Sequence, residues 1–174
     1  MRKKIEAILL GGHVRRYHST PVIHNQTVGH HTFGVASFLV LMGVSNHSLL
    51  VHALWHDLAE AHVGDLPAPI KRRLRQVAHH NNLPDSVKQE EDTYLNHVGL
   101  KLPELTEEEH RYLKLADCFD GMLHCIYERM MGNQTVSKIY WKFRMYAGEL
   151  NPIGRSADIF MELSEMWRSA DGRE

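Results

Sequence analysis

The chain has 174 residues, of which 43% are hydrophobic and 24% are charged, and its formal net charge is −1. This size and composition are typical of one globular domain with an apolar core, which excludes a disordered tail, a fibrous repeat and a low-complexity linker. No apolar run approaches the ~20 residues that span a bilayer, and the apolar stretch 5–10 is too short and polar for a secretory signal. The near-neutral charge provides no basic field for nucleic acid.

The cysteine and histidine content further narrows the expected location and function of the protein. Cys118 and Cys125 are the two cysteines and make no disulfide framework, so we expect a reducing, cytoplasmic location without a membrane partner. Histidine is the outlying residue type, at 14 of 174 positions. Imidazole is the commonest metal ligand in proteins, so histidines that lie near carboxylates on buried helices are the candidates for chemistry.

Helical spacing of apolar residues dominates the sequence, and strand-like alternation is nearly absent. The expected helices, in chain order, cover 3–11, 27–44, 46–63, 69–80, 85–99, 106–131, 136–148 and 156–169. The segment 13–26 between the first two is expected to be an ordered loop. We therefore predict an all-α fold: one compact helical domain over residues 1–174, with seven or eight helices joined by short connections.

Local signals support several of these boundaries. Gly11 and Gly12 predict the end of the first helix. Asn46 or Ser45 is suited to cap the third, and Asp85 follows a proline at the start of the fifth. Thr106 followed by three glutamates is typical of a capping box at the start of the longest helix.

One group of residues has the composition of a metal site. His56 and Asp57 are adjacent, and His31 and Asp117 lie on an earlier and a later predicted helix. Two imidazoles and two carboxylates suit a divalent transition metal such as zinc, manganese, iron or cobalt. His52 and His56 stand four residues apart but lack the glutamate beside the first histidine that zincin proteases have.

Short motifs follow one another in a fixed order over residues 5–130. They are Arg16-Tyr17, Val28-Gly29-His30-His31-Thr32, His56-Asp57-Leu58-Ala59-Glu60, Gly64-Asp65-Leu66-Pro67-Ala68-Pro69-Ile70-Lys71 and Lys114-Leu115-Ala116-Asp117, with Glu128 further along the last helix. The sequence thereby resembles the HD-domain metal phosphohydrolases, in particular bacterial 5′-deoxynucleotidases and the related phage deoxynucleoside triphosphohydrolases. It departs from the usual pattern at His30, Tyr17 and Ala68.

The resemblance implies a role for most of these residues. It implies that the metal ligands are His31, His56, Asp57 and Asp117 and that the catalytic carboxylates are Glu60 and Asp65. It also implies substrate binding by Arg16, Tyr17, Lys71 and Lys114. Two further candidates come from position, since Ser19 shares the loop of Arg16 and Arg75 shares a helix face with Lys71. The expected cofactor is a divalent ion: Zn, Mn, Co, Fe or Mg.

The resemblance leaves two reactions open. The first is hydrolysis of a deoxynucleoside triphosphate of the dATP type, as in the related phage enzymes, by water attack on the α-phosphorus, giving deoxynucleoside and triphosphate. The extra cations Lys71 and Arg75 favour it. The alternative is a 5′-deoxynucleotidase that releases phosphate from a monophosphate.

In both reactions the metal lowers the pKa of a water molecule, Glu60 positions or deprotonates that water, and Asp65 assists or protonates the leaving oxygen. A helical domain that binds a nucleotide or a protein without catalysis is a third reading, disfavoured because every ligand and both carboxylates are present. The resemblance further implies a homo-oligomer, in the host cytoplasm if the chain is phage-encoded.

Overall fold

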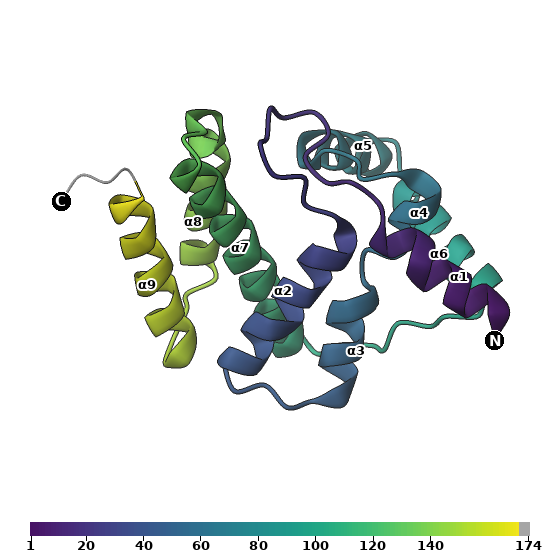
Figure 1. Ribbon diagram of the computed structural model, residues 1–174. Helices are drawn as coiled ribbons and strands as arrows, with labels where there is room; N and C mark the ends of the chain where they lie inside the picture. Colours follow the sequence, from purple (N-terminus) through teal and green to yellow (C-terminus); the bar gives the residue numbers. More distant parts are fainter. Residues whose placement is uncertain (171–174) are drawn as a thin grey trace.

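The computed structural model describes residues 1–170, and over that range the chain is helical, with no β-strand (Figure 1). The elements are α1 Arg2–Gly12, α2 Val28–Leu41, α3 His47–Trp55, α4 Glu60–Val63, α5 Ala68–His80, α6 Ser86–Val98, α7 Glu107–Met130, the 3-10 helix η1 Gln134–Val136, α8 Ser137–Glu149 and α9 Arg155–Ser169. The predicted all-α fold is therefore confirmed. The expected single domain over 1–174 stays a prediction, and its end, 171–174, lies outside the described residues.

Side-chain caps fix several helix starts where the sequence indicates them. The Thr27 hydroxyl accepts the amide N–H of His30, and the His30 ring reaches back to the Thr27 amide, which forms a capping box. Asn46 and Asp85 cap α3 and α6. Thr106 and Glu109 form the expected capping box of α7. These bonds satisfy amide groups that the first helical turn leaves without partners.

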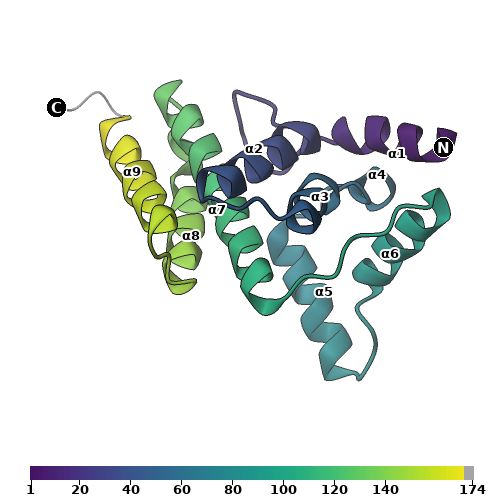
Figure 2. The same cartoon turned by 90° about the horizontal axis from the view of Figure 1, so that it is seen from below.

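The helices form two parts with separate apolar cores. The larger core lies among α2, α3, α7, α8 and α9 and contains the stacked rings of Tyr140 and Trp167, whose centroids are 3.8 Å apart. The smaller core joins α1 and α6 to the turn after α3, through Ala7, Leu58 and Leu95. Figures 1 and 2 show α7, α8 and α9 on one side, α1, α4 and α6 on the other, and α2 and α3 between them. Among the described residues, no helix has the length and apolar character that crossing a bilayer requires.

One expected helix is interrupted in the structure, so its prediction as a continuous helix is wrong. The expected helix 46–63 ends at Trp55, passes through a turn over 56–59 and resumes as the short α4. The His56 ring contributes to this ending, because its Nδ1–H donates to the carbonyl of Ala53 at 2.8 Å. In the turn, Leu58 and Ala59 are buried in the smaller core. The break therefore places His56 and Asp57 between the two parts of the molecule rather than on a regular helix face.

Candidate metal centre

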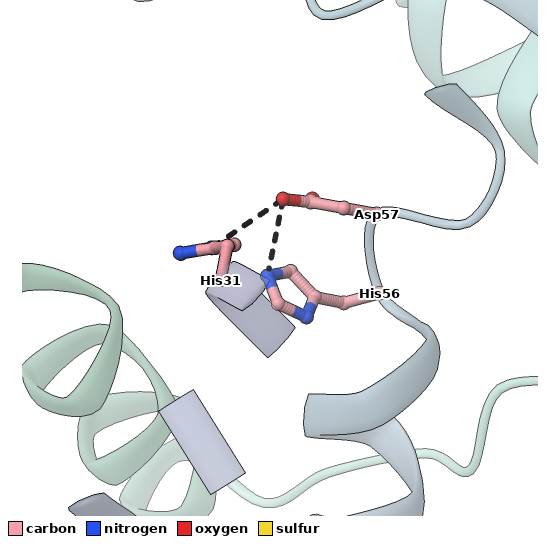
Figure 3. Close-up of side chains that lie close together, drawn as sticks. All are labelled: His31, His56 and Asp57. Atoms are coloured by element: carbon pink, nitrogen blue, oxygen red, sulfur yellow. Dashed lines mark ion pairs between the residues drawn. The ribbon is translucent and has the colours of Figure 1, made fainter. Parts of the chain in front are cut away.

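Three of the four predicted metal ligands converge between α2 and the turn after α3. One ligand atom each of His31, His56 and Asp57 lies within 4.8 Å of the others. Asp57 Oδ2 is 3.5 Å from His31 Nε2 and 3.4 Å from His56 Nε2, as Figure 3 shows. Asp117 on α7 adds a fourth group, with Oδ1 3.4 Å from His31 Nε2. The structure thus brings three predicted ligands together and places the fourth, Asp117, beside His31.

The protonation pattern of the two histidines fits a cation. His31 Nδ1 lies 2.7 Å from the Asp120 carboxylate, and His56 Nδ1 lies 2.8 Å from the Ala53 carbonyl. Both contacts require a proton on Nδ1, which leaves a lone pair on each Nε2. His31 Nε2 is buried and has no hydrogen-bond partner among the described residues. A divalent ion is a suitable partner for this otherwise unsatisfied atom.

The electrostatics of the centre favour a neutral imidazole beside an ionised carboxylate. Burial lowers the pKa of His56 below its ordinary value, so the ring is neutral at pH 7. Burial opposes ionisation of Asp57, but the Arg16 guanidinium, whose Nη1 donates to Asp57 Oδ2, holds the Asp57 pKa well below its usual range. Neutral nitrogen and ionised oxygen are the forms in which these groups bind a metal.

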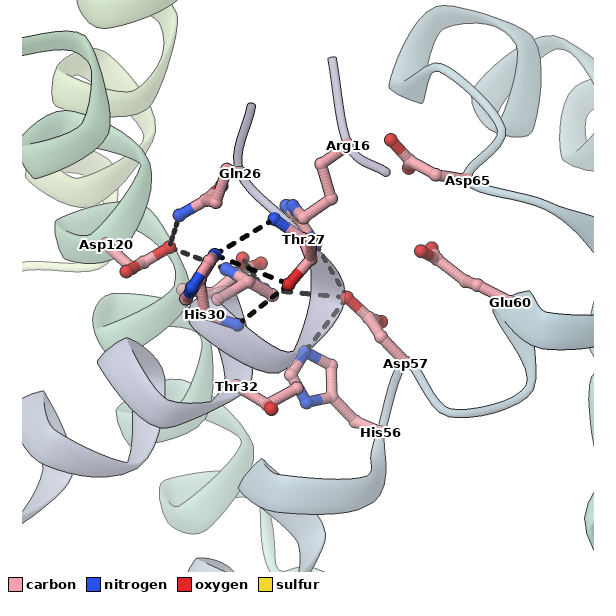
Figure 4. Close-up of polar contacts among 12 residues, drawn as sticks. Arg16, Gln26, Thr27, His30, Thr32, His56, Asp57, Glu60, Asp65 and Asp120 are labelled. Atoms are coloured by element: carbon pink, nitrogen blue, oxygen red, sulfur yellow. Dashed lines mark hydrogen bonds and ion pairs between the residues drawn. The ribbon is translucent and has the colours of Figure 1, made fainter. Parts of the chain in front are cut away.

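The loop between α1 and α2 brings Arg16 and Tyr17 to this centre. Arg16 Nη1 donates to Asp57 Oδ2 at 2.8 Å, and its side chain is largely buried (Figure 4). Tyr17 has φ of +57°, which is unusual for a residue with a side chain, and its ring stacks on His124 of α7. Ser19 is exposed in a turn of the same loop, two residues further along.

The two predicted catalytic carboxylates, Glu60 and Asp65, lie on and just after α4, and Figure 4 shows them on the side of Asp57 away from Asp120. Glu60 is buried, and its Oε1 accepts a bond from Lys71 Nζ at 2.9 Å. Burial and the nearby Asp57 carboxylate raise the pKa of Glu60 to about 8 despite Lys71. Asp65 follows Gly64, whose φ of +77° suits glycine, and its Oδ2 is 3.9 Å from His18 Nδ1.

The predicted phosphate-binding side chains Lys114, Lys71 and Arg75 differ in their partners and in their position relative to the metal centre. Lys114 Nζ is 3.5 Å from Asp117 Oδ2, at the edge of the metal centre. Lys71 contacts Glu60 and lies 3.6 Å from Glu91. Arg75 is exposed and donates to Asp85, the cap of α6. The structure therefore keeps Lys114 and Lys71 near the predicted site but engages Arg75 in a surface ion pair.

Sequence reasoning missed the role of three polar residues of α7. Asp120 accepts bonds from the His31 ring and from Gln26 Nε2, the latter at 2.9 Å. His124 stacks on Tyr17, and Glu128 is fully buried. With Asp117, these residues are spaced by three or four along one helix, so they share a face of α7. A row of polar residues at helical spacing within the otherwise apolar segment 115–128 of α7 was the signal that could have found them.

A helical fold that collects a histidine, a His-Asp pair and a later aspartate at one point defines an HD-domain phosphohydrolase. The comparison with known families agrees, because residues 12–164 match the family described as 5′-deoxynucleotidase YfbR-like. The chain belongs to this family and is a hydrolase. No curated protein matches the sequence significantly.

Solved structures share the fold at low sequence identity. The PH0347 protein of Pyrococcus horikoshii is 18% identical with a TM-score of 0.70, covering 95% of this chain and 99% of that one. The HD-domain phosphohydrolase lin2634 of Listeria innocua is 18% identical with a TM-score of 0.67, covering 98% and 92%. The HD phosphohydrolase DatZ of cyanophage S-2L, bound to dA and one catalytic Zn²⁺, is 18% identical with a TM-score of 0.57, covering 97% and 96%.

Proposed function

We propose that this chain is a metal-dependent 5′-deoxynucleotidase, which hydrolyses a deoxynucleoside monophosphate to deoxynucleoside and inorganic phosphate. The observation that carries the proposal is the set of two Nε2 lone pairs and two carboxylates at the junction of the two helical parts. The family match supports phosphate ester hydrolysis of a deoxynucleotide as the reaction.

The charge around the centre supports a monophosphate rather than the triphosphate that the sequence favoured. That expectation depended on Lys71 and Arg75 as extra phosphate ligands. Lys71 instead pairs with buried Glu60, and Arg75 pairs with Asp85. A cation that is already paired with a carboxyl group of the protein contributes less to binding a triphosphate of about four negative charges than an unpaired one does.

We assign the steps of the reaction as follows. A divalent cation in this site, Zn, Mn, Co, Fe or Mg, supplies a lowered pKa for the attacking water and charge compensation for the phosphate. Arg16 holds the Asp57 carboxylate in place and offers further N–H donors to the phosphate. Glu60, whose pKa is raised from 4.5 to about 8, would accept the proton of the water from its ionised form. Asp65 protonates the leaving 5′ oxygen, and Lys114 and Tyr17 line the substrate site.

Product identity tests this proposal. We expect a panel of dNMPs and dNTPs, assayed with each metal, to release inorganic phosphate from dNMPs, and we expect a chelator to stop the release. Release of intact triphosphate from dATP, without hydrolysis of dAMP, would show that the triphosphohydrolase reading is right instead. If neither product forms under any metal, the non-catalytic reading replaces both.

A pair of variants links the activity to the centre. His56→Ala removes one Nε2 donor, and we expect loss of hydrolysis together with weaker metal binding. His47→Ala is the matched control, because His47 is exposed at the start of α3, the helix that ends just before His56. Circular dichroism verifies that both variants fold. The expected homo-oligomer and cytoplasmic location stay predictions, and light scattering in solution tests the first.

A further inference from the structure

Backbone hydrogen bonds join the two ends of the loop over residues 13–27, but they do not hold its tip, which needs a separate anchor. At its base, the Arg16 amide donates to the Gln26 carbonyl at 2.9 Å, and the Val28 amide donates to the Val14 carbonyl at 2.8 Å. These bonds hold the ends of the loop beside each other. Tyr17, in its left-handed conformation, follows them directly, and such a conformation persists only where the surroundings hold it.

Glu128 provides that anchor from the last turns of α7. Its carboxylate is fully buried and accepts the amide N–H of Ile23 at 2.7 Å and that of His24 at 2.6 Å. The side-chain amide of Asn133 donates to the same carboxylate and also to the Pro21 carbonyl. The Thr135 hydroxyl donates to that carbonyl as well, at 2.9 Å. Bonds to an ionised carboxylate are stronger than neutral ones, so Glu128 is the main fixed point of the tip.

The same helix holds one of the predicted metal ligands and two residues that support the site. Asp117 contributes a ligand oxygen, Asp120 orients the His31 ring, and His124 stacks on Tyr17 with ring centroids 4.5 Å apart. Because α7 is one continuous helix, the positions of Asp117 and Glu128 along it are fixed relative to each other. Glu128 therefore fixes the tip of the loop relative to the metal centre. The bond from Arg16 to Asp57 fixes the part of the loop near its base.

We propose that Glu128 is a positioning residue for substrate binding: it holds the loop so that Arg16 and Tyr17 stay at the metal centre, without itself touching metal or substrate. This inference rests on the proposed function, which places Arg16 and Tyr17 in the substrate site. The consequence is a separation of effects. Loss of the anchor weakens substrate binding, whereas the metal ligands and Glu60, which lie on other segments or earlier on α7, are unaffected.

The test compares Glu128→Gln with Glu108→Gln. The first keeps the shape but replaces an acceptor oxygen with an amide group among N–H donors, and the second makes the same change at an exposed position of α7. For Glu128→Gln we expect KM for the dNMP to rise about tenfold, with kcat within about twofold and zinc affinity unchanged. Hydrogen exchange over residues 20–27 should become faster in this variant alone.

A second variant covers the case in which Glu128→Gln does not fold. Thr135→Val removes only the exposed hydroxyl, which lies 2.9 Å from the Pro21 carbonyl and 2.6 Å from Asn133 Oδ1, and we expect KM to rise roughly threefold. If KM and hydrogen exchange in the variants match those of Glu108→Gln, or if kcat and zinc affinity fall together with the rise in KM, the inference is wrong. A wild-type protein that hydrolyses no deoxynucleotide contradicts the proposed function, whereas an active wild type with unchanged KM in the variants contradicts this inference alone.

Discussion

Replacement of Asp120 by asparagine tests whether the metal centre depends on a residue that does not itself ligate. Asp120 is 5% exposed, and one of its oxygens, Oδ2, accepts both the His31 ring N–H and the Gln26 amide. An asparagine oxygen in the same place can accept both bonds, so the tautomer of His31 is retained. What is lost is the negative charge that makes the imidazole a better donor to the metal.

The expected loss of metal affinity follows from the loss of this charge. Substitution of a residue that supports a metal ligand costs 10–100-fold in affinity, and Asp120→Asn keeps the geometry, so we expect the lower end, about tenfold or about 1.4 kcal/mol. Asp120→Ala also releases the His31 ring and should cost about a hundredfold. Competition with a chelating dye measures zinc affinity, and Asp92→Asn, which removes an exposed carboxylate on α6, is the control. Equal affinities in Asp120→Asn and Asp92→Asn would refute the reasoning.

Three further changes have expected outcomes. In chelator-treated protein the Glu60 pKa rises from 4.5 to about 8 on folding, so the folded state retains a proton that the unfolded state loses, and stability falls as pH rises through this window. Thermal unfolding at about pH 5 and about pH 8.5 should show a larger loss in wild type than in Glu60→Gln, and parallel losses would contradict the assignment. Arg75→Ala should leave KM for the dNMP within about twofold, because exposed Arg75 pairs with Asp85 and not with the metal centre; a tenfold rise in KM in steady-state assays would show that Arg75 binds substrate. Trp167→Ala should cost about 3–5 kcal/mol in urea unfolding, because the indole is buried against Tyr140, and a loss below about 1 kcal/mol would disagree with the packing.

The sequence predicted those parts of the fold that depend on near neighbours. Caps such as Thr106 and Asp85 act within three residues, and apolar spacing reports which side of a helix is buried, so the helices after Pro67 begin close to where they are expected. The types of ligand at the metal centre were also visible, because His and Asp are recognisable as donors before their positions are known. The catalytic and binding roles of these residues stay predictions.

Tertiary structure decided how the residues are combined. The break after Trp55, the bond from Arg16 to Asp57 across 41 residues and the bonds of Glu128 to a loop more than a hundred residues away depend on the packing of whole helices. Packing likewise places the Lys71 ammonium against Glu60, 2.9 Å from its Oε1. Side-chain type and local spacing are properties of the sequence alone, but the charge that remains at a site depends on which distant partners the fold brings against it.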